Sequence, residues 1–387
     1  MSVDYQNDLR RLGQFITQPD ATQCTPQLYA AAMQHKVAGY ILEIMENRLG
    51  STPSDPALEE LANTARTNGW KIIVQDNEMQ AINRLLNDHN IRPIWIKGAA
   101  LAHTIYGNPL LRSRTDLDFI VKEDDFGRAH EHLLESGYFD IKGEKLETGL
   151  DSLDHHIVLR SKRYNSVVVE LHRALLGNAF FKEIPPKTLA RWLQDTLIFS
   201  INGDTYHTLQ PEIHLVYLSA HTMLQHGLKH IIFRNLLDIH LLIQTYPMNW
   251  DIIAKEASNL KWVHLVRSNL DLVDDCFGEH YTDRLESSLM DVPGFTEDAD
   301  RTFLMSHRDT SGELVIRQLQ QLNWKDRITA IYRIALPSRS YMRMRYDIPQ
   351  DRSTAPYYFG RWFRQAKGLA KALFRRLNLL ITSNRDG

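Results

Sequence analysis

Apolar residues recur along the first ninety positions with the spacing of an α-helix. Over 36–49, and again over 57–90, apolar side chains fall three or four positions apart, which places them on one helix face. The second stretch ends at Asn90, before a short apolar run begins. We therefore expect a helical N-terminal subdomain over residues 1–90.

The pattern changes after residue 90, where short apolar runs become frequent. Since few helices accompany many strands, the predicted fold class is α+β, with one helical layer on a small mixed β-sheet. This core would cover 91–205 and be flanked by N-terminal and C-terminal helical subdomains. The predicted strands are 91–97, 115–121, 138–141, 155–160, 166–172 and 197–201, and the predicted helices are 98–106 and 123–136.

Helical periodicity returns after residue 205. Pro211 and Glu212 suit the first turn of a helix, and amphipathic stretches continue to about residue 290. We expect a C-terminal helical subdomain over 206–345, with a loop near 291–311 and a helix over 313–336. Residues 346–387 would form a polar linker and a basic, aromatic helix over 358–381.

Composition limits the class of protein. The chain has 387 residues, of which 43% are hydrophobic and 24% charged, as in ordinary globular proteins. The formal net charge of -2 gives no overall attraction to nucleic acid. Cys24 and Cys276 are far apart and form neither a disulfide pattern nor a metal pattern. The N-terminus lacks an apolar signal core and no run is long enough to span a bilayer, so we expect a cytoplasmic protein.

Charge is nevertheless distributed unevenly. From Lys325 to Arg376, thirteen basic residues stand against three acidic ones, and the rest of the chain is acidic. The basic helix over 358–381 could make a peripheral contact with an anionic membrane. It could also pack on the domain with a solvated basic face, or hold a phosphate-rich acceptor such as RNA. These three alternatives remain open.

The most informative polar residues are Asp116 and Asp118 in the predicted strand over 115–121. Residues two apart on a strand share one face, so both carboxylates project the same way. Two such charges repel unless a cation separates them or one is protonated. Solvent exposure is the alternative, but the apolar residues around them indicate a buried strand. A glycine turn before a helix, at Gly98, suits a phosphate-bound divalent metal nearby.

The order of motifs resembles the uncharacterised nucleotidyltransferase family, a branch of the superfamily with the polymerase-beta-type fold. In that pattern a strand ends in Lys-Gly, an arginine precedes Asp-x-Asp, and a third carboxylate follows as Glu-Leu-His. The matching residues here are Lys97-Gly98, Arg112 or Arg114, Asp116-Leu117-Asp118 and Glu170-Leu171-His172. The segment 336–346 extends the resemblance over most of the chain. Ala99 replaces the usual serine or glycine, and seventeen residues separate Gly98 from Asp116, which is longer than the common gap.

The resemblance implies a metal-dependent enzyme that moves a nucleoside monophosphate from a nucleoside triphosphate, such as ATP, to a hydroxyl or phosphate acceptor. Pyrophosphate would be released. Asp116, Asp118 and Glu170 are the implied catalytic residues and the implied ligands of Mg²⁺, or of Mn²⁺ in its place. Glu170 would complete a second metal site or take the proton of the attacking hydroxyl. The candidates for binding the nucleotide are Lys97, Gly98, Arg112, Arg114 and His172.

Several of these residues also have purely structural interpretations. Lys97 could extend from a strand end into solvent, and Gly98 could serve only the turn. Arg112 and Arg114 compete for one role, and we expect one of them on the surface. Glu170 could form an ion pair with an arginine.

Weaker candidates come from histidines and from a later helix. His156 opens a predicted strand opposite the carboxylates, and His221 lies in a helix that follows the core. Asp238 is a weak site candidate, and its i, i+4 spacing from Arg234 also suits a simple helix ion pair.

The acceptor implied by the resemblance is a small molecule, glycan, peptide or protein. Two alternatives are an RNA- or tRNA-directed, toxin-like nucleotidyltransferase and a non-catalytic nucleotide-binding scaffold. The crowded carboxylates argue against the scaffold, because repelling charges have no use there without a cation.

Overall fold

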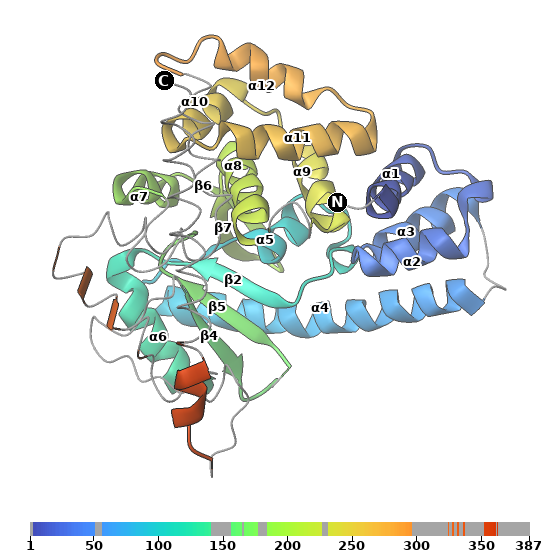
Figure 1. The fold of residues 1–387 in the computed structure, drawn as a ribbon. Helices are drawn as coiled ribbons and strands as arrows, with labels where there is room; N and C mark the ends of the chain where they lie inside the picture. Colours follow the sequence, from blue (N-terminus) through green and yellow to red (C-terminus); the bar gives the residue numbers. More distant parts are fainter. Residues whose placement is uncertain are drawn as a thin grey trace.

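The structure is a computed structural model that combines a mixed β-sheet with helices on both of its sides (Figure 1). It describes residues 3–50, 56–140, 156–164, 166–176, 184–226 and 231–295, together with 352–360 and a few single positions after 323. The α+β fold class is confirmed. None of the described helices is both long and apolar enough to cross a membrane.

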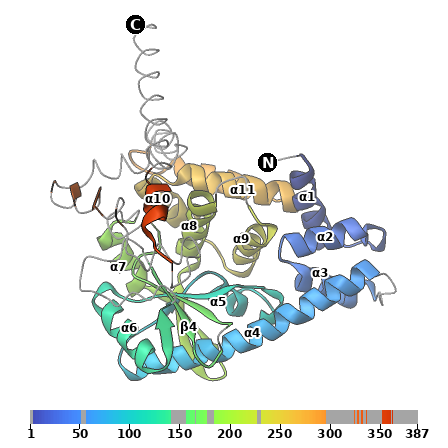
Figure 2. The same cartoon turned by 60° about the horizontal axis from the view of Figure 1, so that its bottom comes forward.

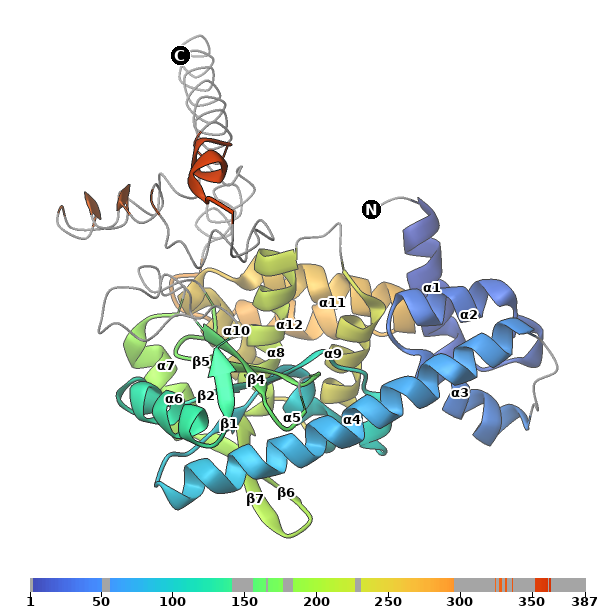
Figure 3. The ribbon, with the colours of Figure 1, turned by 90° about the horizontal axis from the view of Figure 1, so that it is seen from below.

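The N-terminal residues are helical, as predicted. The helices are α1 (Val3–Thr17), α2 (Pro26–Gln34), α3 (Ala38–Ile44) and α4 (Pro56–Asp88). Helix α2 begins with Thr25, whose side chain accepts a hydrogen bond from the backbone N–H of Leu28. Helix α4 has 33 residues and runs from the N-terminal helices to the sheet (Figures 2 and 3).

The sheet has seven strands in the order β3-β4-β5-β2-β1-β7-β6. The strands are β1 (Ile94–Trp95), β2 (Asp116–Ile120), β3 (Tyr138–Asp140), β4 (His156–Ser161), β5 (Val168–His172), β6 (Thr196–Ile201) and β7 (Asp204–Leu209). Between them lie α5 (Lys97–Thr104), α6 (Phe126–Glu135) and α7 (Pro186–Gln194). The pairs β2–β5 and β1–β7 are parallel and the other pairs antiparallel, so the sheet is mixed as predicted.

The C-terminal helices lie on one side of the sheet, opposite α4 (Figure 1). They are α8 (Pro211–His221), α9 (Phe233–Thr245), α10 (Trp250–Leu260), α11 (Val263–Phe277) and α12 (Tyr281–Leu289). Helices α8, α9 and α11 have apolar buried stretches that match the predicted amphipathic segments.

Two apolar clusters cover opposite faces of the sheet. Below it, the second half of α4 packs Met79 and Ile82 against Leu117 and Phe119 of β2. Above it, Ile120 joins a larger cluster that includes the C-terminal helices and α1 to α3. Because β2 contributes apolar side chains to one face and carboxylates to the other, its alternation decides where polar chemistry can lie.

The hairpin of β6 and β7 shows an element that sequence reasoning missed. We predicted β6 but ended the core at residue 205, inside what the structure shows as β7. Asn202 and Gly203 both have positive φ, 52° and 85°, as a two-residue hairpin turn of right-handed twist requires. The Asn-Gly pair was therefore a sufficient signal for a second strand. Helix α7 was also not predicted.

Other predicted elements differ in length or lie outside the described residues. The strand expected over 91–97 is regular only at Ile94–Trp95, because Lys97 already begins α5. The helix expected over 313–336 and most of the basic helix over 358–381 lie outside the described part of the chain. Its described beginning is helical from residue 355, three positions earlier than predicted.

A buried histidine of the C-terminal helices binds the backbone at the start of α5. His214 of α8 accepts a hydrogen bond from the backbone N–H of Lys97, with 3.2 Å between Nε2 and N. Lys97 has φ of 52°, so this contact helps to hold a left-handed turn at the start of α5. Burial lowers the pKa of His214 to about 4, which keeps the ring neutral and able to accept.

Helix packing predicts opposite outcomes for two glycine substitutions. A Cβ at Gly13 of α1 would overlap the backbone carbonyl of Cys276 in α11, whereas a Cβ at Gly69 in α4 would meet no atom within 4 Å. We expect Gly13→Ala to lower the free energy of unfolding by about 1–3 kcal/mol. Gly69→Ala, the matched control, should raise it by about 0.5–1 kcal/mol because it removes a flexible residue from a helix interior. Urea denaturation measures both, and equal effects would contradict this packing.

The neutral state of His214 predicts a pH dependence of stability. Its pKa of about 4 in the folded protein lies below the ordinary value of 6.5, so unfolding takes up a proton between these values. The stability contributed by this group is complete above pH 6.5 and lost as the pH falls towards 4, and it is on the order of 3 kcal/mol. His214→Gln, which keeps an acceptor without titrating, should flatten the pH profile of the unfolding free energy. His280→Gln, at an exposed position, should leave the profile unchanged.

Candidate active site

The carboxylates of β2 and β5 meet on the upper face of the sheet. The two strands are parallel, and Asp118 is the register partner of Glu170. Both side chains lie on the face opposite Leu117 and Phe119, which pack below. The sequence prediction that a carboxylate from a later strand would join the Asp-x-Asp pair therefore agrees with the register. His172, two positions after Glu170, lies on the same face.

Asp118 is the most enclosed carboxylate of this cluster, with 2% of its surface exposed. Lys97 Nζ donates to Asp118 Oδ1 over 2.7 Å, and His172 Nε2 lies 3.0 Å from the same oxygen. Burial alone would raise the pKa of Asp118, but Lys97 and His172 hold it well below its usual value. Asp118 is therefore ionised. The Lys97 ammonium group forms an ion pair with this carboxylate. The interpretation of Lys97 as a solvent-facing residue at a strand end is therefore wrong.

Glu170 connects two histidines to the cluster. Its Oε2 lies 3.4 Å from His172 Nε2, and its Oε1 lies 3.9 Å from His156 Nε2. No described arginine forms an ion pair with Glu170, in contrast to the structural alternative considered above. One donor atom from each of Asp118, Glu170 and His172 falls within 4.8 Å of the others, a grouping that could hold a metal ion.

Asp116 lies at the start of β2. Together with Asp118 and Glu170 it lines a cavity. Burial, followed by the charges of Asp118 and Glu170, raises its pKa to about 6. This carboxylate is therefore less well compensated than Asp118, although Lys97 lowers its pKa in part.

The donor set fits a divalent cation. Of the three carboxylates, only Asp118 forms an ion pair with an ammonium group, that of Lys97, and Asp118 and Glu170 both add to the rise that burial causes in the pKa of Asp116. Carboxylate oxygens are the ligands that Mg²⁺ and Mn²⁺ prefer, and His172 adds one nitrogen. Asp116, Asp118, Glu170 and His172 are thus the residues that could hold such an ion.

The turn between β1 and α5 closes one side of the cavity. Gly98 lines it, and a Cβ at this position would lie 3.1 Å from Arg112 Nη1 and 3.3 Å from Arg114 Cβ. The N-cap of α5, Ile96, makes no side-chain capping bond. Gly98 therefore allows the helix start to approach the arginine-bearing loop closely, and it is more than a simple turn residue.

Arg112 and Arg114 are both buried, so the expectation that one of them is on the surface is wrong. Arg112 donates from Nε and Nη2 to the two oxygens of Asp238, over 2.7 and 2.6 Å. Arg114 forms an ion pair with Asp76 of α4 and donates from Nε to Gln75 over 3.1 Å. Each guanidinium charge thus already has a carboxylate partner, which offsets the cost of burying it.

The ion-pair partner of Asp238 is Arg112 and not Arg234. Asp238 also accepts a hydrogen bond from Tyr106 over 2.8 Å. The helix ion pair considered for Arg234 and Asp238 is replaced by this arrangement, since Arg234 donates from Nη1 to the backbone oxygen of Ser113 over 2.9 Å. Asp238 faces the cavity as the weaker sequence candidate suggested.

The cavity has a volume of about 290 Å³ and is lined by residues of all three parts of the chain. His156 and His221, the weaker histidine candidates, line it too. Sequence reasoning did not propose Lys36 or Arg234 as site residues, although both line the cavity. Neither belongs to a motif, and they come from helical segments far from the Asp-x-Asp strand, so no local pattern marked them.

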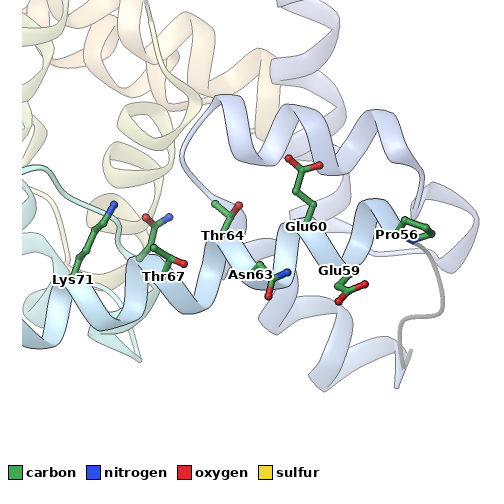
Figure 4. A pocket seen from close by; sticks show the side chains of 8 residues that line it. Pro56, Glu59, Glu60, Asn63, Thr64, Thr67 and Lys71 are labelled. Carbon is green, nitrogen blue, oxygen red and sulfur yellow. The ribbon is translucent and has the colours of Figure 1, made fainter.

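A second hollow, of about 470 Å³, follows the first half of α4 (Figure 4). Its lining comes from that helix alone, and it includes Glu59, Glu60 and Lys71. Because it joins no residues from different elements, it lacks the convergence of charges that the cavity above the sheet has.

Comparison with known protein families finds one whose pattern matches this chain. The family described as "Uncharacterised nucleotidyltransferase" matches residues 24–278, which is more than half of the chain and contains every site candidate named above. Comparison with curated proteins finds no match. The chain therefore belongs to the uncharacterised nucleotidyltransferase family.

Proposed function

We propose that the protein is a metal-dependent nucleotidyltransferase. It moves a nucleoside monophosphate from a nucleoside triphosphate to a hydroxyl or phosphate acceptor. The observation that carries the proposal is the register of β2 and β5, which places Asp118 beside Glu170. Asp116 and the Lys97-Gly98 turn line the same cavity. Family membership supports the same class of reaction.

The proposed reaction is a displacement at the α-phosphorus of the donor. An oxygen of the acceptor forms a bond to that phosphorus, the bond to the β-bridging oxygen breaks, and pyrophosphate leaves. A divalent ion held by Asp116, Asp118 and Glu170 would neutralise phosphate charge and make the attacking oxygen more reactive. Glu170 is also the candidate acceptor for the proton of the attacking hydroxyl.

Lys97 has two potential partners in this proposal. Without a nucleotide its ammonium group compensates Asp118, from 2.7 Å away. Burial alone would lower the pKa of Lys97, but Asp118 raises it above its usual value, so the group stays charged. With a nucleotide bound, the same charge can bind a phosphate oxygen, and the first turn of α5 at Gly98 offers amide donors beside it. Mg²⁺ is the expected physiological ion and ATP the first donor to test.

Nucleotide binding should require both the metal and the carboxylates. We expect calorimetric titration with ATP to detect binding by the intact protein with Mg²⁺ or Mn²⁺ and not with EDTA. In Asp116→Asn/Asp118→Asn the affinity should fall by more than about 100-fold, since losing even the partners of metal ligands costs 10–100-fold. Asp124→Asn, at an exposed position in the same part of the chain, is the matched control and should bind normally.

Circular dichroism would establish that the double variant remains folded. Metal-dependent binding of normal affinity by a folded double variant would exclude these carboxylates as the site. Absence of ATP binding by the intact protein would count against the proposed function.

Removing the Lys97 charge should strengthen metal binding and weaken nucleotide binding. In Lys97→Met the Asp118 carboxylate has lost its ammonium partner, so a cation no longer competes for that oxygen. We expect Mn²⁺ affinity without nucleotide, measured by electron paramagnetic resonance, to rise about tenfold, and ATP affinity to fall by a similar factor. Lys122→Met, at an exposed position after β2, is the control. Unchanged Mn²⁺ affinity in Lys97→Met would contradict this role of Lys97.

A further inference from the structure

Among the described residues, two cations of the cavity, Lys36 and Arg234, lack the carboxylate partners that Arg112 and Arg114 have. Arg112 is matched by Asp238 and Arg114 by Asp76. Among the described residues, no carboxylate forms an ion pair with Lys36 or Arg234, although both line the cavity. The charges of Asp116 and Asp238 act on these cations without a direct ion pair, so the donor groups of Lys36 and Arg234 are not occupied by a carboxylate among the described residues.

Among the described residues, Arg234 has one donor that is bound and one that is not. Its Nη1 donates to Ser113 O, whereas its Nε is buried and finds no hydrogen-bond partner there. Burial, followed by the nearby charge of Arg112, lowers the pKa of Arg234 to about 10, so the group is still charged at neutral pH. A buried donor without a partner is costly, which makes it a ready binding group for an anion.

Lys36 reaches the same side from the N-terminal helices. It has φ of 62°, and its backbone oxygen accepts a hydrogen bond from Ser113 Oγ over 2.7 Å. Ser113 thus forms hydrogen bonds with both residues: its Oγ donates to Lys36 O, and its backbone oxygen accepts from Arg234. Burial and the charges of Arg234 and Arg112 lower the pKa of Lys36, and two cations crowded in this way are stabilised when an anion lies between them.

The first turn of α9 lies at the same place. Ile232 is the N-cap and makes no side-chain capping bond, while Ile232 and Asn235 both line the cavity. The N–H of Phe233 donates to His35 Nδ1 over 3.2 Å and that of Asn235 to Ile232 O over 2.9 Å, so the turn is fixed and contributes mainly through its partial charge. A helix of 13 residues carries a partial positive charge at this end, which favours an anion.

We propose that Lys36, Arg234 and the first turn of α9 form a phosphate-binding subsite of the cavity. It is separate from the Lys97-Gly98 turn, and it is built jointly by the N-terminal and C-terminal helices. Its ligand is a phosphate group of a substrate, carried either by the donor as a β- or γ-phosphate or by the acceptor as a phosphate ester. The assignment to a substrate rests on the proposed function, whereas the binding of phosphate does not.

Inorganic pyrophosphate tests the subsite without metal or nucleotide. We expect calorimetry in EDTA to detect pyrophosphate binding by the intact chain. The affinity should fall about tenfold or more in Lys36→Gln and further in Lys36→Gln/Arg234→Gln, because each removes a charged hydrogen-bond donor. Lys71→Gln is the matched control, since Lys71 lines the separate hollow along α4 and should leave the affinity unchanged (Figure 4).

Two further variants keep the outcome interpretable. Among the described residues the Lys36 side chain forms no hydrogen bond or ion pair, so Lys36→Gln serves if the loss of the Arg234–Ser113 bond prevents folding. Asp116→Asn/Asp118→Asn should still bind pyrophosphate in EDTA. Pyrophosphate binding by the intact protein, together with a failure of the intact protein to bind ATP when metal is present, would reject the proposed function and retain the subsite.

The source of the phosphate follows from titrations with Mn²⁺ present. If the subsite holds the donor, Lys36→Gln/Arg234→Gln should lose ATP affinity about tenfold or more while AMP affinity stays the same. If it holds the acceptor, ATP and AMP affinities should both stay the same, and pyrophosphate should bind the ATP-saturated intact protein but not the variant. Pyrophosphate affinity that is equal in the intact protein and the double variant, or undetectable in the intact protein, would overturn the proposal.

Discussion

The charge of Asp118 is the constraint on which the site depends. This carboxylate lies in the middle of a seven-stranded sheet with 2% of its surface exposed, and an unpaired charge there would be very costly. Lys97 and His172 both approach its Oδ1 oxygen, so the end of β1, the start of α5 and the end of β5 must all meet at this point. His214 then fixes the backbone of Lys97 from α8, which carries the same constraint into the C-terminal helices.

The cavity combines a sheet and two sets of helices, each with a different electrostatic role. The sheet supplies carboxylates through the alternation of β2 and β5, and Asp118, Glu170 and His172 are grouped closely enough to hold a metal ion. The helices supply Lys36 and Arg234, which suit phosphate. The cavity thus brings carboxylates and cations together, an arrangement that suits a metal-bound nucleotide.

Two buried ion pairs explain why the loop before β2 has a defined position. Asp238 of α9 holds Arg112, and Asp76 of α4 holds Arg114, so the loop is attached to helices on both sides of the sheet. Breaking one partner of such a pair leaves an uncompensated buried charge, which costs about 3–5 kcal/mol. These arginines therefore act first by positioning Gly98 and Asp116, whatever contact they make with a substrate.

The sequence by itself determined the α+β class, most strands and the carboxylate face, because these depend on local periodicity: Asp116 and Asp118 share a face in any strand. Even the missed strand β7 had a local signal, the Asn202-Gly203 turn. Only the tertiary structure decided that Arg112 and Arg114 are paired and that Lys36 and Arg234 are not. Whether a charge is compensated depends on which distant segments pack around it, and periodicity within one segment carries no information about that.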